Sequence, residues 1–250
     1  MELAVVTGVS RGLGEQVAKV LLKKGIHVIG ISRSSHDLGS TAEEGGVTYT
    51  HLEKDLSHLI DLQEINEEIT NRLESRQIKK LYLVNNAAIL GPINQGMYYE
   101  PEQLAIHVQI NTLAPMVLMN HFLKVSNKKQ IPFTGVTITS GAAERPVYGW
   151  SAYCSTKASI NMYTKTVGLE QEVEGTENKV FAFSPGVMDT NMQAEIRSRT
   201  KEQFKDVESF RQYKERNALR DPKKVGQILV KLLLDEKIEN GKVYYVTDYE

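Results

Sequence analysis

The sequence is poor in the features that mark secreted, zinc-binding and membrane proteins. Its 250 residues contain a single cysteine, Cys154, which excludes both an internal disulfide and a zinc site built from clustered cysteines. No window approaches the roughly 18 consecutive apolar residues of a membrane-spanning helix. The opening residues 1–8 lack the basic lead and the long apolar stretch of a signal peptide. We therefore expect a cytoplasmic protein with no membrane partner.

The net charge is also close to zero, because 30 basic residues nearly balance 31 acidic ones and leave a formal charge of -1. Without a basic face, a nucleic-acid partner is not expected. No linker, repeat or low-complexity tract divides the chain, so residues 1–250 have the length and apolar content of one α/β domain. His107 and His121 share an expected helix but do not stand at a metal spacing with an acid, so no metal site is expected.

What the sequence does contain is a regular alternation of strand-like and helix-like segments. The expected strands are 3–7, 27–32, 47–51, 80–84, 135–139, 179–184 and 242–247. The expected helices are 15–24, 57–76, 101–125, 153–173, 191–214 and 222–234. This order predicts a single doubly wound, Rossmann-like α/β domain, with a parallel seven-stranded sheet and helices on both faces.

Two segments depart from the alternation. Residues 34–46 are rich in Ser, Gly, Asp and Glu, which predicts a mobile polar surface loop. Residues 191–220 are charged but contain spaced apolar side chains. These are Met192, Ile196, Phe204, Phe210 and Tyr213. The pattern suits an amphipathic flap over a substrate pocket, and it suits an ordinary pair of surface helices equally well.

The first turn reads Thr7-Gly8-Val9-Ser10-Arg11-Gly12-Leu13-Gly14 and stands between a strand and a helix. Glycines at such a turn let the backbone approach a pyrophosphate, whose charge the helix N-terminus favours. Glycine-rich turns also simply end strands, so the signal depends on its strand-turn-helix setting. The residues expected to contact the phosphates are Gly8, Ser10, Arg11, Gly12, Leu13 and Gly14.

The end of the second expected strand bears on which dinucleotide is bound. An acidic residue there would bind the ribose 2′-hydroxyl of NAD, but the strand ends Ile31-Ser32-Arg33-Ser34. Arg33, followed by Ser34, can pair with a 2′-phosphate, and Arg11 can reach the same group. Exposed arginines are often merely solvated, yet the missing acid favours NADP(H).

Tyr153 and Lys157 stand four residues apart on an expected helix and therefore share a face. The spacing is weak evidence alone, because a chain with 11 tyrosines and many lysines contains about one such pair by chance. Ser140, however, ends the expected strand 135–139, where an open parallel sheet places its ligands. A hydroxyl, a phenol and an ammonium are thereby expected at one site.

Together these motifs resemble the classical short-chain dehydrogenase/reductase family over nearly the whole chain. The glycine turn resembles the family's TGxxxGxG, residues 85–88 its NNAG, and residues 185–190 its PGxxxT segment beside the nicotinamide. The resemblance implies a catalytic tetrad of Asn111, Ser140, Tyr153 and Lys157. It also implies cofactor contacts from Asp55, Leu56, Asn86, Ala87, Tyr153, Lys157, Pro185, Gly186, Val187 and Thr190.

The family's chemistry implies a role for each member of the tetrad. Tyr153 donates the proton to a carbonyl oxygen, and the ammonium of Lys157 brings the pKa of this phenol closer to working pH and binds the nicotinamide ribose. Ser140 hydrogen-bonds the carbonyl, and Asn111 holds a water that passes protons to Lys157. Residues near the tetrad in sequence suit an aromatic pocket wall for an aryl ketone or diketone, although core packing explains them as well. They are Ile89, Tyr148, Trp150, Met188 and Met192.

The flanking sequence is similar to bacterial sepiapterin-reductase-like proteins, including benzil reductases of bacilli. This similarity implies an NADPH-dependent carbonyl reductase that converts a ketone or α-diketone to an alcohol. Ala88 replaces the usual glycine, and Thr139 stands where a second serine is common. Tyr245 occupies the position of the aspartate that anchors the pterin in animal sepiapterin reductases, and Asp248 comes three residues late.

Two alternatives remain open. One is a sepiapterin or other pterin carbonyl reductase, which Tyr245 disfavours. The other, from a different class, is a non-catalytic NADP-binding sensor, which has no need of the tetrad. The family's subunit contacts also imply a homodimer or homotetramer.

Overall fold

The computed structural model describes residues 1–250 and contains one parallel sheet in the order β3-β2-β1-β4-β5-β6-β7. The strands are β1 (Glu2–Thr7), β2 (His27–Ser32), β3 (Tyr49–Glu53), β4 (Lys80–Asn85), β5 (Phe133–Ile138), β6 (Lys179–Ser184) and β7 (Val243–Tyr245). Their inner members are almost continuously apolar and buried, as expected where helices cover both faces of a parallel sheet. The prediction of a single doubly wound domain is confirmed.

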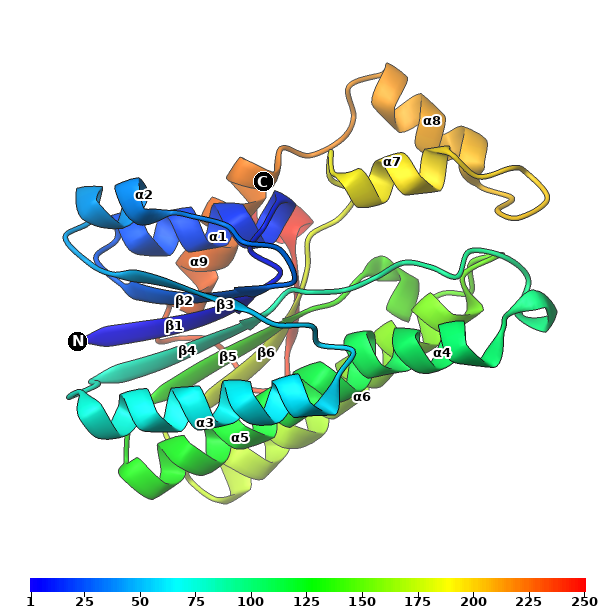
Figure 1. Cartoon of the computed structure of the whole chain (residues 1–250). Coiled ribbons are helices and arrows are strands. Elements are labelled where there is room, and N and C mark those ends of the chain that lie inside the picture. Colours follow the sequence, from blue (N-terminus) through cyan, green and yellow to red (C-terminus); the bar gives the residue numbers. More distant parts are fainter.

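Helices cover the sheet in two layers (Figure 1). One layer holds α1 (Gly12–Lys23), α2 (Gly39–Glu44) and α9 (Pro222–Leu233), and the other holds α3 (Leu59–Ser75), α5 (Ala114–Lys129) and α6 (Ser151–Val173). Each layer packs its apolar side chains on the sheet as one buried cluster. The strand order reverses between β1 and β4, and ligands of such sheets bind at the carboxyl ends of the strands beside that point.

Two segments differ from the expected elements. The region 34–46 is not a loop throughout, because it contains the short helix α2, whose Ala42 is buried together with the preceding Leu38. The expected helix 101–125 is divided into α4 (Pro101–Val108), a π-helical turn η2 (Gln109–Leu113) and α5. Pro115 has no N–H to bond with the carbonyl of Asn111, so the regular hydrogen-bond ladder is interrupted at this point.

The last third of the chain also differs in detail. The expected helix 191–214 is two helices, α7 (Asn191–Arg197) and α8 (Val207–Glu215), which Figure 1 shows beyond the carboxyl ends of the strands. The final strand is shorter than expected and continues into the 3-10 turn η4 (Val246–Tyr249). Two further 3-10 turns are η1 (Gly96–Tyr98), after β4, and η3 (Gly141–Ala143), after β5. None of the helices combines the length and the apolar character needed to cross a lipid bilayer.

Candidate active site

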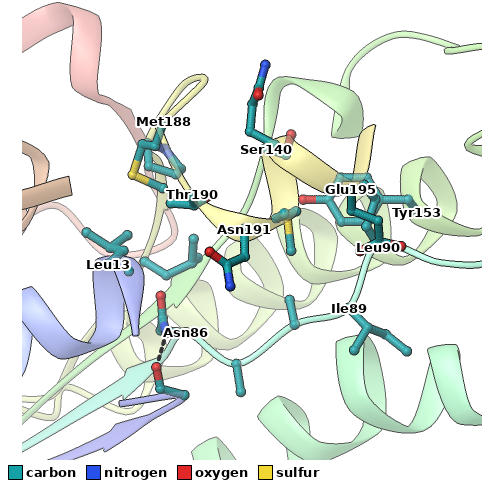
Figure 2. A pocket seen from close by; sticks show the side chains of 18 of the residues that line it. Leu13, Asn86, Ile89, Leu90, Ser140, Tyr153, Met188, Thr190, Asn191 and Glu195 are labelled. Atoms are coloured by element: carbon teal, nitrogen blue, oxygen red, sulfur yellow. Dashed lines mark hydrogen bonds between the residues drawn. The ribbon is translucent and has the colours of Figure 1, made fainter. Parts of the chain in front are cut away.

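A cleft of about 1130 Å³ lies at the carboxyl ends of β1, β4, β5 and β6. Leu13, Asn86, Met188 and Thr190 are grouped at one end, and Ser140, Tyr153, Leu90 and Glu195 at the other (Figure 2). The predicted residues that line it are Gly8, Ser10, Arg11, Gly12, Leu13, Arg33, Ser34, Asp55, Leu56, Asn86, Ala87, Ile89, Ser140, Trp150, Tyr153, Lys157, Pro185, Gly186, Val187, Met188, Thr190 and Met192. Three predicted residues, Gly14, Asn111 and Tyr148, are not among its lining residues.

The glycine turn is shaped by close approach as well as by backbone conformation. Gly8 has a φ of +73°, and a side chain on Gly14 would come within 2.3 Å of the carbonyl oxygen of Gly8. Gly14 therefore serves the packing of the turn, although it does not face the cleft. The N-cap of α1, Arg11, makes no side-chain hydrogen bond to the first turn of the helix. The amides of this turn are available to an anion, as a dinucleotide pyrophosphate requires.

Asn86 holds the turn after β1 against the turn after β4. Its Nδ2 donates to the carbonyls of Thr7 at 2.9 Å and Gly8 at 3.2 Å. The Thr7 hydroxyl accepts from the backbone amides of Asn86 and Ala87, each at 3.0 Å. These hydrogen bonds join residues that are nearly eighty positions apart in the sequence. The two turns at the cofactor end of the cleft therefore cannot move apart without breaking them, which makes this end a rigid cradle.

The two predicted 2′-phosphate ligands, Arg11 and Arg33, are exposed at this end of the cleft. Neither makes an ion pair or a side-chain hydrogen bond within the chain, whereas the nearby Lys54 pairs with Asp61 and Glu64. Asp55 also lines this end, at the predicted adenine contact. Two unpaired guanidinium groups and no acid at the ribose position fit a 2′-phosphate.

The segment after β6 is anchored by Arg220, which sequence reasoning did not identify. Its backbone pairs with the segment in both directions, from Arg220 N to Val187 O and from Asp189 N to Arg220 O, each at 3.0 Å. Its side chain lies under Gly186, where an added Cβ would meet the guanidinium at 2.5 Å. The same guanidinium donates two hydrogen bonds to the carboxylate of Glu250, at 2.6 and 2.9 Å. No local pattern marks this contact, because its partners are far apart in sequence.

At the other end of the cleft, α6 presents Tyr153 and Lys157 on one buried face, 7% and 3% exposed. The ammonium of Lys157 lies 5.6 Å from the centre of the Tyr153 ring and donates to the carbonyl of Ile138 at 2.8 Å. Ser140 follows β5, and its Oγ accepts from the amide of Ala142 at 3.2 Å. The structure thus brings the hydroxyl, the phenol and the ammonium together as predicted.

The pKa of Tyr153 differs from the expectation that Lys157 brings it closer to working pH. Burial raises the pKa of Tyr153 to about 12, and the neighbouring Ser140 hydroxyl only partly opposes that shift. Burial also lowers the pKa of Lys157 to about 8. Desolvation disfavours the charged form of each group, and it is the largest influence on both pKa values. The phenol therefore carries its proton at neutral pH, as a proton donor must.

Asn111 lies behind the cleft, in the π-helical turn. Its Oδ1 accepts from the amide of Ile89 at 2.9 Å, and its Nδ2 donates to the carbonyl of Ile89 at 2.8 Å. The second amide hydrogen points to Nε2 of His107 at 3.0 Å. The side chain thus holds the loop after β4, and both amide hydrogens are used. Its expected role in a proton-relay water stays a prediction.

An aromatic cluster forms the wall beside Tyr153. Trp150 stacks on Phe204, with ring centres 4.7 Å apart, and meets Phe210 and Tyr153 edge-on at 5.6 and 5.4 Å. Phe204 precedes α8 and Phe210 lies within it. Ile196 and Phe204 are buried in the same cluster, with Met192 and Phe210 packed against it. Of the apolar residues of 191–220, Met192, Ile196 and Phe210 thus line the cleft, whereas Phe204 is fully buried without lining it and Tyr213 is 41% exposed.

Tyr148 differs from the expected pocket wall. Its ring is exposed under Lys205, whose Nζ lies 5.2 Å from the ring centre, while its neighbours Val147 and Trp150 turn inward. Several lining residues that the motifs did not identify are Leu90, Arg145, Asn191, Glu195 and Phe210. Apolar periodicity marks only the last of them. No three His, Cys, Asp or Glu side chains come together as a metal-binding group.

Known proteins resemble this chain in sequence and in fold. The family model described as short chain dehydrogenase matches residues 2–201. A benzil reductase ((S)-benzoin forming) of Bacillus subtilis is 38% identical over 100% of both chains, and a sepiapterin reductase of Bos taurus is 27% identical over 96% of this chain and 92% of its own.

A solved structure, the short-chain dehydrogenase/reductase YIR035C of Saccharomyces cerevisiae, superposes with a TM-score of 0.83 at 26% identity, covering 98% of this chain and 96% of its own. Members of this family act on small molecules with a nicotinamide dinucleotide. The chain belongs to the short-chain dehydrogenase family and is an oxidoreductase.

Proposed function

We propose that this chain is an NADPH-dependent carbonyl reductase that reduces an aryl ketone or α-diketone to an alcohol. The observation that carries the proposal is the buried phenol of Tyr153, whose raised pKa keeps it protonated beside Ser140 and Lys157. A protonated donor serves reduction, in which a carbonyl oxygen gains negative charge and needs a proton. The full-length similarity to a benzil reductase supports the same direction and substrate class.

In the proposed reaction, a bound NADPH supplies the hydride to the carbonyl carbon. Ser140 and the Tyr153 hydroxyl hold the carbonyl oxygen, and Tyr153 transfers its proton to that oxygen as the negative charge develops. The ammonium of Lys157 stabilises the resulting phenolate and also binds the cofactor ribose. The Ile138 carbonyl keeps this ammonium at the floor of the cleft.

The choice of NADP(H) rests on Arg11 and Arg33. Both guanidinium groups lack an ion-pair partner in the chain and border the same end of the cleft. A 2′-phosphate would accept bidentate, charge-assisted hydrogen bonds from them. An NAD-specific site would instead need an acidic side chain at the end of β2, where Ser32 and Arg33 stand.

The proposal of an aryl substrate rests on Trp150 together with Phe204 and Phe210 of the segment 191–220, which would act as a flap over the cleft. Stacked and edge-on rings offer an apolar surface for a second aromatic group.

A pterin reductase is the weaker candidate. Tyr245, at the position of the pterin anchor, donates to Glu144, and neither side chain lines the cleft. A non-catalytic sensor would not need a buried Tyr153 and Lys157.

The proposal of a homo-oligomer rests on apolar side chains left exposed on α4, η2 and α6. They are Leu104, Ile106 and Val108 on α4, Leu113 on η2, and Met162, Leu169 and Val173 on α6. A second copy packed on this surface would cover them. Sedimentation of the wild type and of Leu169→Glu measures the association, and a wild-type monomer at micromolar concentration contradicts it.

The test of the activity is NADPH oxidation with benzil, acetophenone and sepiapterin under identical conditions. We expect kcat/KM for benzil to exceed the other two by about tenfold or more, because only benzil uses both the aromatic wall and the reducible diketone. Strong turnover of sepiapterin alone would replace the proposal by the pterin reductase. No turnover of any carbonyl, with NADPH still bound, would support the sensor.

A further inference from the structure

His107 is completely buried one helical turn before Asn111, and the proposed reaction does not use it. It contacts three segments that form the carbonyl end of the cleft. Its Nδ1 lies 2.6 Å from the carbonyl oxygen of Gly91, and its Nε2 lies 3.0 Å from Nδ2 of Asn111 and 3.1 Å from the hydroxyl of Thr156. A buried histidine with a partner for both ring nitrogens has a defined protonation state.

The partners determine that state. The Gly91 carbonyl is only an acceptor, so Nδ1 carries the hydrogen and donates it. Asn111 accepts from the amide of Ile89 with its oxygen, so its nitrogen faces His107 and donates. Nε2 must therefore be an unprotonated acceptor. The ring is neutral and in the Nδ1–H form.

The surroundings oppose any second proton on this ring. The only charged side chain that bears on it is the ammonium of Lys157 on α6, and the ring of Tyr153 meets it edge-on with centres 6.3 Å apart. Burial lowers the pKa of His107, the bond to Gly91 raises it, and Lys157 lowers it again, with a net downward shift. An added proton on Nε2 would face the amide hydrogen of Asn111.

These bonds connect the two walls between which a carbonyl has to lie. On one side they hold the loop of Ile89 and Gly91, both of which line the cleft. On the other they reach Thr156, between Tyr153 and Lys157 on α6. Its hydroxyl oxygen lies 3.0 and 3.1 Å from the carbonyl oxygens of Ala152 and Tyr153, and its one hydrogen can turn to Nε2 instead. The ring thus spans from the loop after β4 to the turn of helix that carries the proton donor.

We propose that His107 is a positioning residue, which in its neutral Nδ1–H form sets the distance between the Ile89–Gly91 loop and Tyr153. The inference rests on the proposed reductase activity for its kinetic consequence, but its protonation state can be measured without turnover. Because the cofactor cradle is held separately by Thr7 and Asn86, loss of His107 acts on carbonyl reduction and spares dinucleotide binding.

Two substitutions separate the two halves of the ring. His107→Gln retains an acceptor oxygen near the place of Nε2, and His107→Asn retains a donor near the place of Nδ1. We expect His107→Asn to lower kcat for the carbonyl by about tenfold or more, since it leaves the Asn111 amide unpaired in the interior, and His107→Gln to recover part of that loss. The Kd for NADPH should change by less than about threefold in both.

The matched control is His121→Gln on α5. His121 is partly buried and hydrogen-bonded to Thr70 at 3.2 Å, away from the cleft, so the same chemical change tests general destabilisation. We expect a lower thermal unfolding temperature with unchanged kcat. Equal kcat losses in His107→Asn and His121→Gln, or a parallel loss of NADPH affinity in His107→Asn, would overturn the positioning role.

Long-range 1H–15N correlation spectra of the imidazole rings test the protonation state directly, with the His107→Gln spectrum assigning one of the 6 histidines. A neutral ring protonated on Nδ1 at pH 7 is the expected result, and an Nε2–H form or an imidazolium overturns the inference. If the wild type reduces no carbonyl, the proposed function fails while this spectrum still decides the state of His107.

Discussion

The two ends of the cleft are built from different kinds of interaction. At the cofactor end, the glycine backbone, the first turn of α1 and the Thr7–Asn86 hydrogen bonds form a cradle. Its binding groups are mainly backbone atoms, and few side chains contribute to specificity. At the carbonyl end, the surface consists of side chains from β5, α6 and the segment 191–220 that meet only in the folded chain. A backbone cradle suits a cofactor that does not vary, whereas a side-chain wall can be altered without disturbing it.

The sharpest test of this division removes the proton donor alone. Tyr153→Phe should lower kcat for ketone reduction by about 10²–10⁴-fold, because the developing alkoxide loses its proton source. The Kd for NADPH, measured by fluorescence titration, should stay within about threefold. Tyr148→Phe is the control, since its ring is exposed outside the cleft. Turnover above a tenth of the wild-type rate in Tyr153→Phe would remove Tyr153 from its role.

A second substitution acts only on the cofactor end. Arg33→Asp should raise the Kd for NADPH by about ten- to a hundredfold, because a charge-assisted hydrogen bond is replaced by repulsion between the new carboxylate and the 2′-phosphate. NADH should bind as before or better. Arg76→Asp, at the exposed end of α3, makes the same charge change far from the cleft. Equal weakening of NADPH and NADH by Arg33→Asp would contradict the phosphate clamp.

The pH dependence of kcat should depend only on ionisable groups at the carbonyl end of the cleft. The Lys157 ammonium is present below its pKa of about 8 and is lost above it, whereas Tyr153, with a pKa of about 12, keeps its proton throughout. At saturating NADPH, kcat for reduction should therefore be about tenfold lower at pH 9 than at pH 7. A profile that stays flat to pH 10 would show that the charge of Lys157 is not needed.

The smallest effect is expected in the aromatic wall. Phe210→Ala removes one edge-on partner of Trp150 and should raise KM for an aryl diketone by about two- to tenfold, with NADPH affinity unchanged. Trp150 is the only tryptophan, so its emission reports the same change directly. Tyr213→Ala, on the exposed side of α8, should leave KM as it is. An unchanged KM in Phe210→Ala would place the aryl group elsewhere.

Local sequence predicted those features that depend on near neighbours. Alternating apolar segments were sufficient to predict the parallel sheet and its order of elements, and the glycine turn marked the cleft together with Ser140, Tyr153 and Lys157. Prediction failed where contacts between residues far apart in the sequence determine the local structure. The helix α2 depends on Leu38 and Ala42 packing beneath a polar composition, and the division of α7 from α8 depends on Phe204 entering the cluster of Trp150.

By itself, the sequence determined the fold class and indicated the dinucleotide cradle and the proposed proton donor, because the signals for them lie in short stretches of the chain. The tertiary structure decided how the donor is tuned and what surrounds it. Burial, which no local pattern displays, raised the pKa of Tyr153 above the expected range. Long-range packing likewise brought His107 and Arg220 to segments that they contact only after folding, and it moved Tyr148 away from the wall it was expected to form.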